Sequence, residues 1–278
     1  MSNKKRRDIP RFDTPIIETH CHLDYLDQSE LSVTLEKSIA MGVERIITIA
    51  VSADNLNRVM ELTRASPYIW GTQGIHPHDA DTYTPAVDDI IRAHATDTRI
   101  VAIGEIGLDY HYDHADRSVQ RKAFEAQLQT AVDLDLPVVI HTREADEDTR
   151  AILRNYSSAL TRKGVIHSFT SGLALAEYCL EEGFMLGFNG IITFNRADNV
   201  REIVAATPLS QIVLETDAPY LTPVPYRGKP NAPYYLPFIA EAVAAIKAID
   251  IEALLAQANS NSRKLFFSDT QPGIESTG

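Results

Sequence analysis

Two histidines separated by one residue, His20 and His22, lie in an apolar stretch of the chain that begins at Ile16. Side chains alternate between the two faces of a β-strand, so we expect both imidazoles on one face and Cys21 on the other, toward covering helices. Two imidazoles on one face can bind a metal ion. Two histidines packed beside a core would give the same pattern, so the choice depends on further ligands elsewhere.

Four more residues with metal-binding side chains close short β-rich segments later in the chain. They are Glu105, His141, His167 and Asp217, at the ends of segments 100–105, 137–141, 164–167 and 211–217. A buried carboxylate is costly unless it is paired or bound to a metal, which argues against six unrelated core residues. We therefore predict a metal site. His94 and His114 fall in a predicted helix and a polar loop, and we expect both at the surface.

Short β-rich segments alternate with amphipathic segments along the whole chain, which is typical of parallel β/α units. The predicted strands are 16–20, 45–51, 69–75, 100–105, 137–141, 164–167, 184–188 and 211–217. The predicted helices are 31–41, 55–65, 87–95, 118–134, 146–156, 174–182, 199–206, 237–249 and 251–267. This order predicts one α/β domain, a (β/α)8 TIM barrel over 16–267, with a flexible basic leader (1–15) and a flexible tail (268–278).

In such a barrel the carboxyl ends of the strands meet at one mouth, which would bring the six candidates together. Six ligands exceed the four that one tetrahedral ion needs, so we predict two divalent ions. Asp217 joins His20 and His22 at one ion, because the first and last strands are neighbours in a closed barrel. His141 and His167 bind the other, and Glu105 bridges the two ions. Imidazoles favour zinc or manganese over magnesium, and the metal stays open among these three.

The net charge of −12 argues against a large basic surface for duplex nucleic acid. Bound cations can still supply positive charge locally, so an acidic protein can process phosphodiesters. The chain has no apolar run long enough to span a bilayer and no secretory signal after Met1. Two cysteines, neither in a CxxC pair, fit a reducing compartment, and we expect a cytoplasmic protein without membrane contact or an obligate protein partner.

Six motifs carry a resemblance to a known family. They are His20-Cys21-His22-Leu23-Asp24, Gly74-Ile75-His76-Pro77-His78, Gly104-Glu105-Ile106-Gly107-Leu108-Asp109-Tyr110, His141-Thr142-Arg143-Glu144, His167-Ser168-Phe169, and Glu215-Thr216-Asp217-Ala218-Pro219-Tyr220-Leu221-Thr222-Pro223. In order and spacing, over residues 16–267, the series resembles the TatD family of metal-dependent deoxyribonucleases. The resemblance implies a TIM-barrel phosphodiesterase, with 3'-to-5' exonuclease activity and single-stranded DNA ends as a transient partner. It also implies metal contacts at the same six residues.

The expected reaction is metal-assisted hydrolysis, with Glu105 and Asp217 as catalytic residues and Asp217 as the general base. His76 is a candidate for binding the scissile phosphate, although it could simply shape the loop around Pro77. Arg143 and Arg227 could donate bidentate hydrogen bonds to the same phosphate, or form salt bridges at the rim. Glu215, two residues before Asp217, could orient a histidine ligand.

Three positions depart from the pattern of this family. Glu18 stands where an aspartate is usual, Thr170-Ser171-Gly172 replaces a more glycine-led turn, and Lys229-Pro230-Asn231-Ala232-Pro233 lacks an acid before its last proline. None removes a predicted ligand. We expect all three near the rim of the barrel, where they would affect substrate preference.

Two other functions fit parts of the same pattern. Related barrels with the same His-x-His opening hydrolyse small amides, lactones or phosphotriesters, which makes an amidohydrolase-like esterase or lactonase one alternative, and the resemblance also allows cleavage of an ester such as aminoacyl-tRNA. Many amidohydrolases place a modified lysine at the bridging position, where this chain has Glu105. A metal-binding scaffold in protein quality control is the non-enzymatic alternative, but such structural sites are normally closed.

Overall fold

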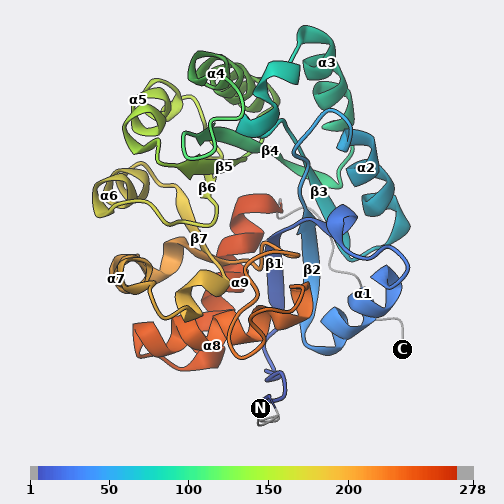
Figure 1. Ribbon diagram of the computed structural model, residues 1–278, viewed down its shortest axis with the longest axis vertical. Helices are drawn as coiled ribbons and strands as arrows, with labels where there is room; N and C mark the ends of the chain where they lie inside the picture. The colour runs from blue at the N-terminus through green and yellow to red at the C-terminus, as the bar shows by residue number, and fades with distance from the viewer. Residues whose placement is uncertain (1–5, 268–278) are drawn as a thin grey trace.

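Eight parallel strands form the centre of the molecule in a computed structural model that describes residues 6–267 (Figure 1). The strands are β1 (Ile16–Cys21), β2 (Val43–Thr48), β3 (Ile69–Gln73), β4 (Ile100–Asp109), β5 (Val138–Arg143), β6 (Gly164–Ile166), β7 (Met185–Phe188) and β8 (Ile212–Leu214). Each pairs in parallel with the next one along the chain. The predicted (β/α)8 TIM barrel is confirmed.

Helices surround the strands as an outer layer (Figure 1). They are α1 (Leu31–Ala40), α2 (Leu56–Ala65), α3 (Pro85–His94), α4 (Arg117–Leu134), α5 (Asp146–Tyr156), α6 (Leu173–Glu181), α7 (Asp198–Ala206), α8 (Leu236–Lys247) and α9 (Ile251–Phe266). Short 3-10 helices occupy Leu23–Tyr25, Pro77–Thr82, Gly190–Thr193, Leu209–Gln211 and Pro233–Tyr235. Among the described residues, no helix is both long enough and apolar enough to cross a bilayer.

The seam between β8 and β1 is closed by hydrogen bonds at and beyond the end of β8. The hydroxyl of Thr19 donates to the carbonyl of Leu214 at 3.0 Å. Further along, the amide of Asp217 donates to the carbonyl of His20 at 2.9 Å, and the amide of His22 donates to the carbonyl of Ala218 at 2.8 Å. These bonds place the first and last segments of the barrel side by side at the mouth.

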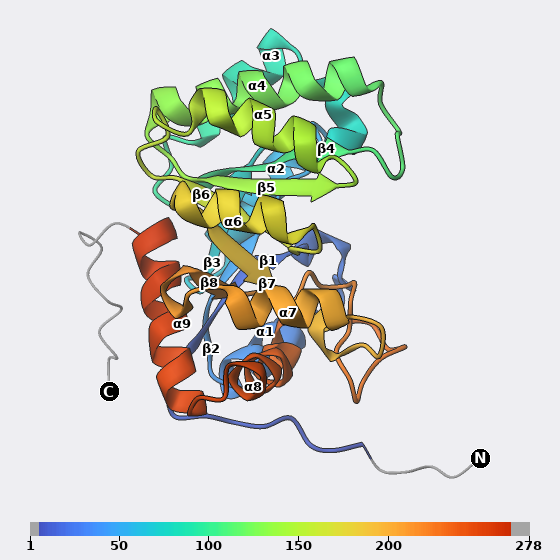
Figure 2. The ribbon, with the colours of Figure 1, turned by 90° about the vertical axis from the view of Figure 1, so that its left-hand side faces the viewer.

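Alternation along the strands divides the apolar residues between two cores. Ile46 and Val138 pack in the layer between strands and helices, whereas their neighbours Ile47 and Val139 belong to a second cluster inside the barrel. Phe266, at the end of α9, belongs to this inner cluster. Figure 2 shows α9 across the end of the barrel opposite the strand arrowheads. One end of the barrel is therefore plugged by apolar side chains, and the other is left for polar residues.

Seven of the eight strand ends differ from the predicted ones, and three of these differences concern residues near the mouth. β8 stops at Leu214, three residues before the predicted end, and β6 stops at Ile166. Asp217 has a φ of +58°, a left-handed conformation that strand residues do not adopt. β4, in contrast, continues to Asp109, because Asp109 pairs with Arg143 of β5.

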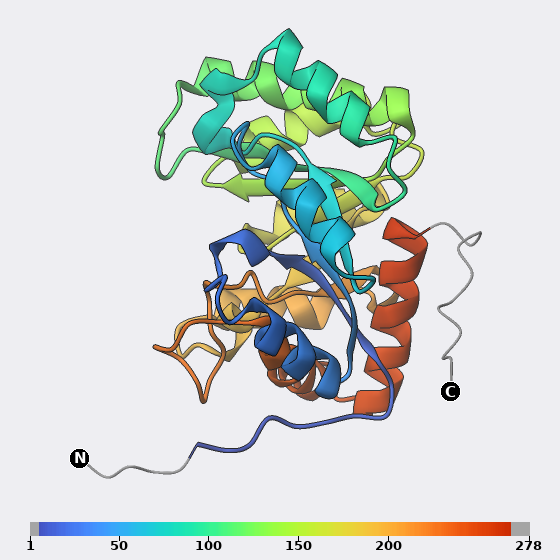
Figure 3. The same ribbon diagram turned by 90° about the vertical axis from the view of Figure 1, so that its right-hand side faces the viewer.

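Residues 6–15 contain no helix or strand but run along the side of the barrel (Figure 3). Glu252, at the start of α9, accepts hydrogen bonds from the amides of Asp13 and Thr14 at 3.0 and 2.8 Å. Arg7 forms an ion pair with Glu241 of α8, and its carbonyl accepts from the hydroxyl of Tyr226. This part of the leader expected to be flexible thus makes specific contacts. Residues 1–5 and the predicted tail 268–278 lie outside the described residues.

Candidate metal centre

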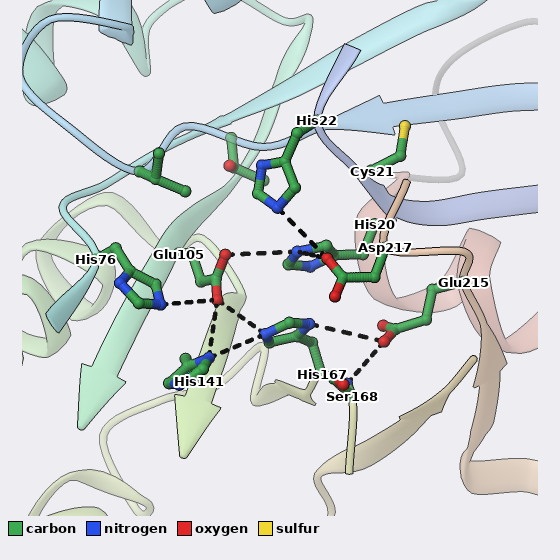
Figure 4. A network of polar contacts seen from close by, with 12 residues as sticks. His20, Cys21, His22, His76, Glu105, His141, His167, Ser168, Glu215 and Asp217 are labelled. Atoms are coloured by element: carbon green, nitrogen blue, oxygen red, sulfur yellow. Dashed lines mark hydrogen bonds and ion pairs between the residues drawn. The ribbon is translucent and has the colours of Figure 1, made fainter. Parts of the chain in front are cut away.

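His20 and His22 point into the mouth of the barrel from β1 and the residue that follows it (Figure 4). Both rings are buried, and their Nε2 atoms lie 3.6 and 3.4 Å from Oδ1 of Asp217. Cys21 points away from them, and its Sγ lies 3.7 Å from the carbonyl of Ile47. The predicted alternation is confirmed, and the seam brings the predicted third member, Asp217, to the pair.

Glu105 lies between two groups of imidazole nitrogens (Figure 4). Its Oε2 is 3.4 Å from Nε2 of His20, on the Asp217 side. Its Oε1 is 2.8 Å from Nε2 of His167 and 3.1 Å from Nδ1 of His141. The two oxygens of one carboxylate thus face two groups of donors. All six predicted ligands lie together, with Glu105 among the imidazoles.

The donor atoms of this cluster fit a divalent metal ion. His20, His22 and Asp217 each offer one ligand atom within 4.8 Å of the other two. Among the described residues, both ring nitrogens of His20 are buried without a hydrogen-bond partner, as is Nδ1 of His22. A buried nitrogen without a partner is costly, and a cation at Nε2 of His20 would remove that cost. Imidazole and carboxylate donors are the usual set for such ions.

The charges of the cluster also suit a cation. Burial opposes ionisation of Glu105, but His167, His76 and His20 hold its pKa well below the usual value. Burial raises the pKa of Asp217, but the hydrogen bond from His22 and the nearby His20 and His167 together outweigh burial and lower it. Two carboxylates therefore stay ionised in a buried site. Burial and the nearby His167 lower the pKa of His20, which favours the neutral ring that a metal ligand must have.

Asp109 contacts the His141 ring at Nε2, the nitrogen that faces away from the cluster. Its Oδ2 lies 3.0 Å from Nε2 of His141 and 2.9 Å from Nε2 of His78. Its Oδ1 accepts from the amides of His111 and Tyr112 at 3.0 Å each. A proton on Nε2 of His141 bonds to this carboxylate and leaves the lone pair on Nδ1, the nitrogen that faces the cluster.

Asp109 was part of a motif in the sequence but was not predicted as a site residue. Glu105, Gly107 and Asp109 recur at every second position of β4, so alternation already places them on one face. Gln120 of α4 fixes the backbone there, because its Oε1 accepts from the Asp109 amide at 2.8 Å and its Nε2 donates to the Asp109 carbonyl at 3.1 Å. The predicted strand ended at Glu105, whereas β4 continues to Asp109, so the prediction did not place Asp109 on the same face.

His76 lines the mouth as a hydrogen-bond donor. Its Nδ1 accepts from the amide of His78 at 3.1 Å, so in the neutral ring the proton is on Nε2. That nitrogen lies 3.4 Å from Oε1 of Glu105. Burial lowers the pKa of His76 to about 4, which keeps the ring neutral near pH 7. A protonated Nε2 has no lone pair for a metal, although His76, Glu105 and His141 do cluster.

The mouth itself is a cavity of about 780 Å³ that contains the predicted ligands His22, Glu105, His141, His167 and Asp217 in its wall. His76 and Arg143 line it too, and so do Tyr25, Tyr112 and Tyr220. His114, expected at the surface away from any site, also lines the cavity and stacks on His78 at 4.5 Å between ring centres. Arg227 does not line the mouth; it lines a neighbouring groove beside Phe194.

The model of the TatD related DNase family matches residues 17–267. The chain belongs to the TatD family. It is 34% identical over 252 residues to the uncharacterized metal-dependent hydrolase YabD of Bacillus subtilis, covering 90% of this chain and 98% of the relative. It is also 34% identical to the 3'-5' ssDNA/RNA exonuclease TatD of Salmonella typhimurium, over 83% of this chain and 90% of the relative.

The fold is shared with a solved TatD homologue, YJJV of Escherichia coli. That structure superposes with a TM-score of 0.86 at 28% identity, covering 91% of this chain and 98% of the other. A mutant organophosphorus hydrolase superposes with a TM-score of 0.66 at 14% identity, which reflects the barrel fold alone. Together, the family match and the cluster of donors identify the chain as a metal-dependent hydrolase of the TatD family.

Two acidic residues support the TatD centre from within the barrel. Glu215 accepts from the amide of Ser168 at 2.7 Å, and its Oε1 lies 3.6 Å from Nδ1 of His167, which agrees with the predicted orienting role (Figure 4). Glu18 is fully buried rather than at the rim, where it was expected. Its Oε1 accepts from the amides of His20 and Thr216, so it joins β1 to the segment after β8. Burial raises its pKa to about 8.

Proposed function

We propose that this protein is a phosphodiesterase that binds two divalent ions and removes nucleotides from the 3' end of single-stranded DNA. The observation that carries the proposal is the position of Glu105. Its Oε2 lies 3.4 Å from Nε2 of His20 and its Oε1 lies 2.8 Å from Nε2 of His167, at an open mouth. The relative from Salmonella typhimurium that is named a 3'-5' ssDNA/RNA exonuclease supports this choice of substrate.

One ion would be held by His20, His22 and Asp217, the other by His141 and His167, and Glu105 would contact both. Such ions act as Lewis acids and lower the pKa of water, in place of a positively charged protein surface. The ion identity stays among zinc, manganese and magnesium. An acidic protein can process an anionic polymer in this way, because the carboxylates of Glu105 and Asp217 would bind the ions and the ions would bind the phosphates.

Asp217 is the proposed general base. Its side chain is 15% exposed and lines the mouth, so it can reach a water molecule there. The low pKa of Asp217 keeps the carboxylate ionised at neutral pH, as a proton acceptor must be. Only one of its oxygens, Oδ1, faces the histidines, which leaves the other oxygen to accept the proton from the attacking water.

His76 and Arg143 are the proposed phosphate-binding residues at the mouth. The Nε2–H of His76 donates without adding a charge, and it faces Glu105 at the centre of the site. The guanidinium of Arg143 lies 4.9 Å from the ring centre of Tyr112, at the edge of the same cavity. His76 would supply a neutral donor inside the mouth and Arg143 a cation at the rim. This combination suits a bound phosphodiester, because the ions would neutralise part of its negative charge.

We also propose that the protein acts in the cytoplasm. Cys21 and Cys179 are buried and free, and neither has a partner for a disulfide among the described residues. Burial raises the pKa of the Cys179 thiol to about 12, so it stays protonated and unreactive. Free thiols of this kind fit a reducing compartment.

The test uses single-stranded DNA oligonucleotides labelled at the 5' or the 3' end, with added Mn²⁺ or Mg²⁺. We expect stepwise shortening of the 5'-labelled strand, early release of a labelled nucleotide from the 3'-labelled strand, and no reaction with excess chelator. Replacing both metal-binding partners, His141→Ala with Asp217→Ala, should abolish the activity. Glu177→Ala, an exposed acid on α6, is the matched control and should leave it unchanged.

Three results would each reject part of this proposal. Release of nucleotides first from the 5' end would reverse the polarity. Turnover of small esters or lactones by a protein that leaves DNA and RNA intact would favour the amidohydrolase-like alternative. Tight metal binding without turnover of any of these substrates would favour a metal-binding scaffold.

A further inference from the structure

Two grooves lead outward from the mouth of the barrel. The first, here called the acidic groove, has a volume of about 660 Å³ and is lined by Glu144, Asp146, Glu147 and Asp148, after β5. The second, here called the basic groove, has a volume of about 530 Å³ and is lined by Phe194, Arg196 and Arg227, after β7 and β8. Thr170 lines both grooves and the mouth, so each groove adjoins the site.

The two grooves differ in charge. Four carboxylates line the acidic groove, and the one cationic side chain among its lining residues is Arg143, at its border with the mouth. Asp148 is paired with Arg121 at 3.1 Å, and Oε1 of Glu144 lies 2.7 Å from Nδ1 of His111, so Asp146 and Glu147 are the two carboxylates of this groove without an ion pair among the described residues. The basic groove has two arginines and no carboxylate among its lining residues. In a chain of net charge −12, this is a strong local contrast. A phosphodiester backbone would be repelled by the first groove and attracted by the second.

The basic groove is built on loops that leave the metal centre directly. Arg227 lies on the segment between β8 and α8, the same segment that begins with Glu215 and Asp217. Phe194 follows the 3-10 helix Gly190–Thr193, just after β7. Exposed Arg227 reaches back over this ring, with 4.1 Å between its Cζ and the ring centre of Phe194. The aromatic ring therefore holds a guanidinium in the groove.

Close contacts between the two loops keep this arrangement in place. The amide of Val224 donates to the hydroxyl of Thr193 at 3.0 Å. At Gly190 a Cβ atom would lie only 1.9 Å from the carbonyl oxygen of Leu221, so the backbones approach at a distance that only glycine allows. The groove is thus set in position relative to Asp217 by the backbone, and not by long side chains alone.

We propose that the basic groove binds the single-stranded nucleic acid next to the scissile phosphate. Arg196 and Arg227 contact successive phosphates, and the Arg227–Phe194 pair gives a neighbouring base a flat surface to stack on. Stacking on an aromatic or guanidinium plane tolerates every base, which suits a strand read without sequence preference. The inference rests on the proposed phosphodiesterase function and adds the path of the strand: out of the mouth past Ile191, away from the acidic groove.

The first experiment compares two substrates with the double variant Arg196→Gln, Arg227→Gln. One is a single-stranded oligonucleotide of about ten nucleotides, and the other is bis(4-nitrophenyl) phosphate, which has one phosphodiester and therefore no further phosphate for the groove to bind. We expect KM for the oligonucleotide to rise about 10- to 100-fold with kcat changed less than about twofold, because two charged phosphate contacts are lost before the reaction. Turnover of the small diester should stay at the wild-type value.

The salt dependence gives a second, independent readout. For single strands, each phosphate contact contributes about 0.7 to the slope of log affinity against log salt, so losing two should lower the slope by about 1.4. The matched control is Arg150→Gln, Arg154→Gln, two exposed arginines of α5 that line neither the mouth nor either groove. It removes the same charge from the protein and should change neither KM nor the slope.

Phe194 is a positioning residue in this proposal, and its variants test that role. Phe194→Leu removes the ring under Arg227 and should raise KM for the oligonucleotide about 10- to 30-fold, since an exposed cation–π pair and a stacked base are both lost. Phe194→Tyr keeps the aromatic face and should restore the wild-type KM. A general loss of structure would instead lower kcat on both substrates.

Failure of the inference is distinct from failure of the proposed function. Equal effects of the double variant on both substrates, or an unchanged oligonucleotide KM, would show that the strand does not follow the basic groove. If the wild type hydrolysed neither substrate, the proposed function would fail. Fluorescence anisotropy with a labelled oligonucleotide, on the wild type and the double variant, would then still decide whether the groove binds single strands.

Discussion

The carboxylate of Asp109 lies 3.0 Å from Nε2 of His141, on the side of the ring opposite to the metal-binding cluster. Nδ1 of the same ring lies 3.1 Å from Glu105. His141 is therefore held between two carboxylates, one at each nitrogen. The carboxylate of Asp109 favours a proton on Nε2 of His141. The lone pair of Nδ1 is then free to bind a cation.

We predict that Asp109→Asn weakens metal binding and activity without unfolding the protein. An amide at this position can donate to Nε2 of His141, which would move the ring proton to Nδ1 and remove the lone pair that faces Glu105. We expect a loss of about 10- to 100-fold in metal affinity and in kcat/KM. Titration with Mn²⁺, followed by activity, measures both.

The matched control for this variant is Asp113→Asn. Asp113 lies four residues beyond Asp109, in the loop after β4, but pairs with Arg117 at the surface, so the variant should keep wild-type metal affinity. Wild-type affinity in Asp109→Asn itself would show that the orientation of His141 does not depend on this carboxylate.

Removal of metal should lower the thermal stability of the protein. Several buried ring nitrogens at the mouth have no partner among the described residues, and ionised Glu105, which is buried, and Asp217, which is half-buried, lie beside them. A ligand that binds only the folded state at 100 times its Kd adds about 2.7 kcal/mol. We expect a lower Tm after chelation, recovered with Mn²⁺ or Zn²⁺, and no such response in His20→Ala. A Tm independent of metal in the wild type would contradict the two-ion assignment.

Gly107→Ala should be strongly destabilising and should disturb His141. Gly107 has a φ of +139°, and a Cβ atom there would lie 1.9 Å from the carbonyl oxygen of His141. The strain of such a backbone alone costs about 1–3 kcal/mol, and the collision adds to it. Gly183→Ala is the control, because its φ is +87° but its nearest neighbour would be 3.7 Å away. Urea unfolding and activity assays should show a larger loss of stability and of activity for Gly107→Ala than for Gly183→Ala. Equal losses in the two variants would show that the collision with His141 is not the cause.

Asp88 should stabilise the protein in a pH-dependent way. It accepts from Arg92 Nε at 2.6 Å, from Thr130 at 2.7 Å and from Tyr83 at 2.9 Å. Burial raises its pKa, but these three donors outweigh burial and leave the pKa below the usual value. Because the folded pKa is the lower one, the contribution is present above the unfolded pKa of about 3.9 and is lost as pH falls through the folded pKa.

Asp88→Asn should therefore lower the free energy of unfolding by about 1–3 kcal/mol at pH 7. The difference from wild type should shrink as pH falls below about 4, because the unfolded chain takes up the proton first and the folded carboxyl takes it up at lower pH. Urea unfolding between pH 3 and pH 7 measures it. The exposed neighbour Asp89 provides the control variant Asp89→Asn, which should show little change. A difference that grew toward low pH would have the wrong sign for this mechanism.

Local patterns in the sequence were sufficient for the barrel and for much of the centre. Alternation alone placed His20 and His22 on one face and Cys21 on the other, because side chains along a strand repeat every two residues. The order of strands and helices predicted the mouth, because the carboxyl ends of parallel strands meet there. Both rules need only neighbouring residues, which is why they can be applied without knowledge of distant contacts.

Other features were decided only by contacts between distant segments. Asp217 follows β8 instead of ending it, and the hydrogen bond from its amide to the carbonyl of His20 sets its place. Glu18 was expected at the rim but lies inside the barrel, bonded to the amide of Thr216. Neither position follows from the two-residue alternation of a strand, because each depends on the hydrogen bonds between β1 and the segment after β8.

The sequence by itself determined which side chains could bind metal and that a barrel would collect them. The tertiary structure alone decided that Asp109 contacts Nε2 of His141. That contact depends on the pairing of β4 with β5, which extends as far as Asp109 and Arg143. It also decided that Arg227 lies on Phe194 in a groove beside the mouth. Loops after different strands take their relative positions from long-range packing, which no local pattern of residues encodes.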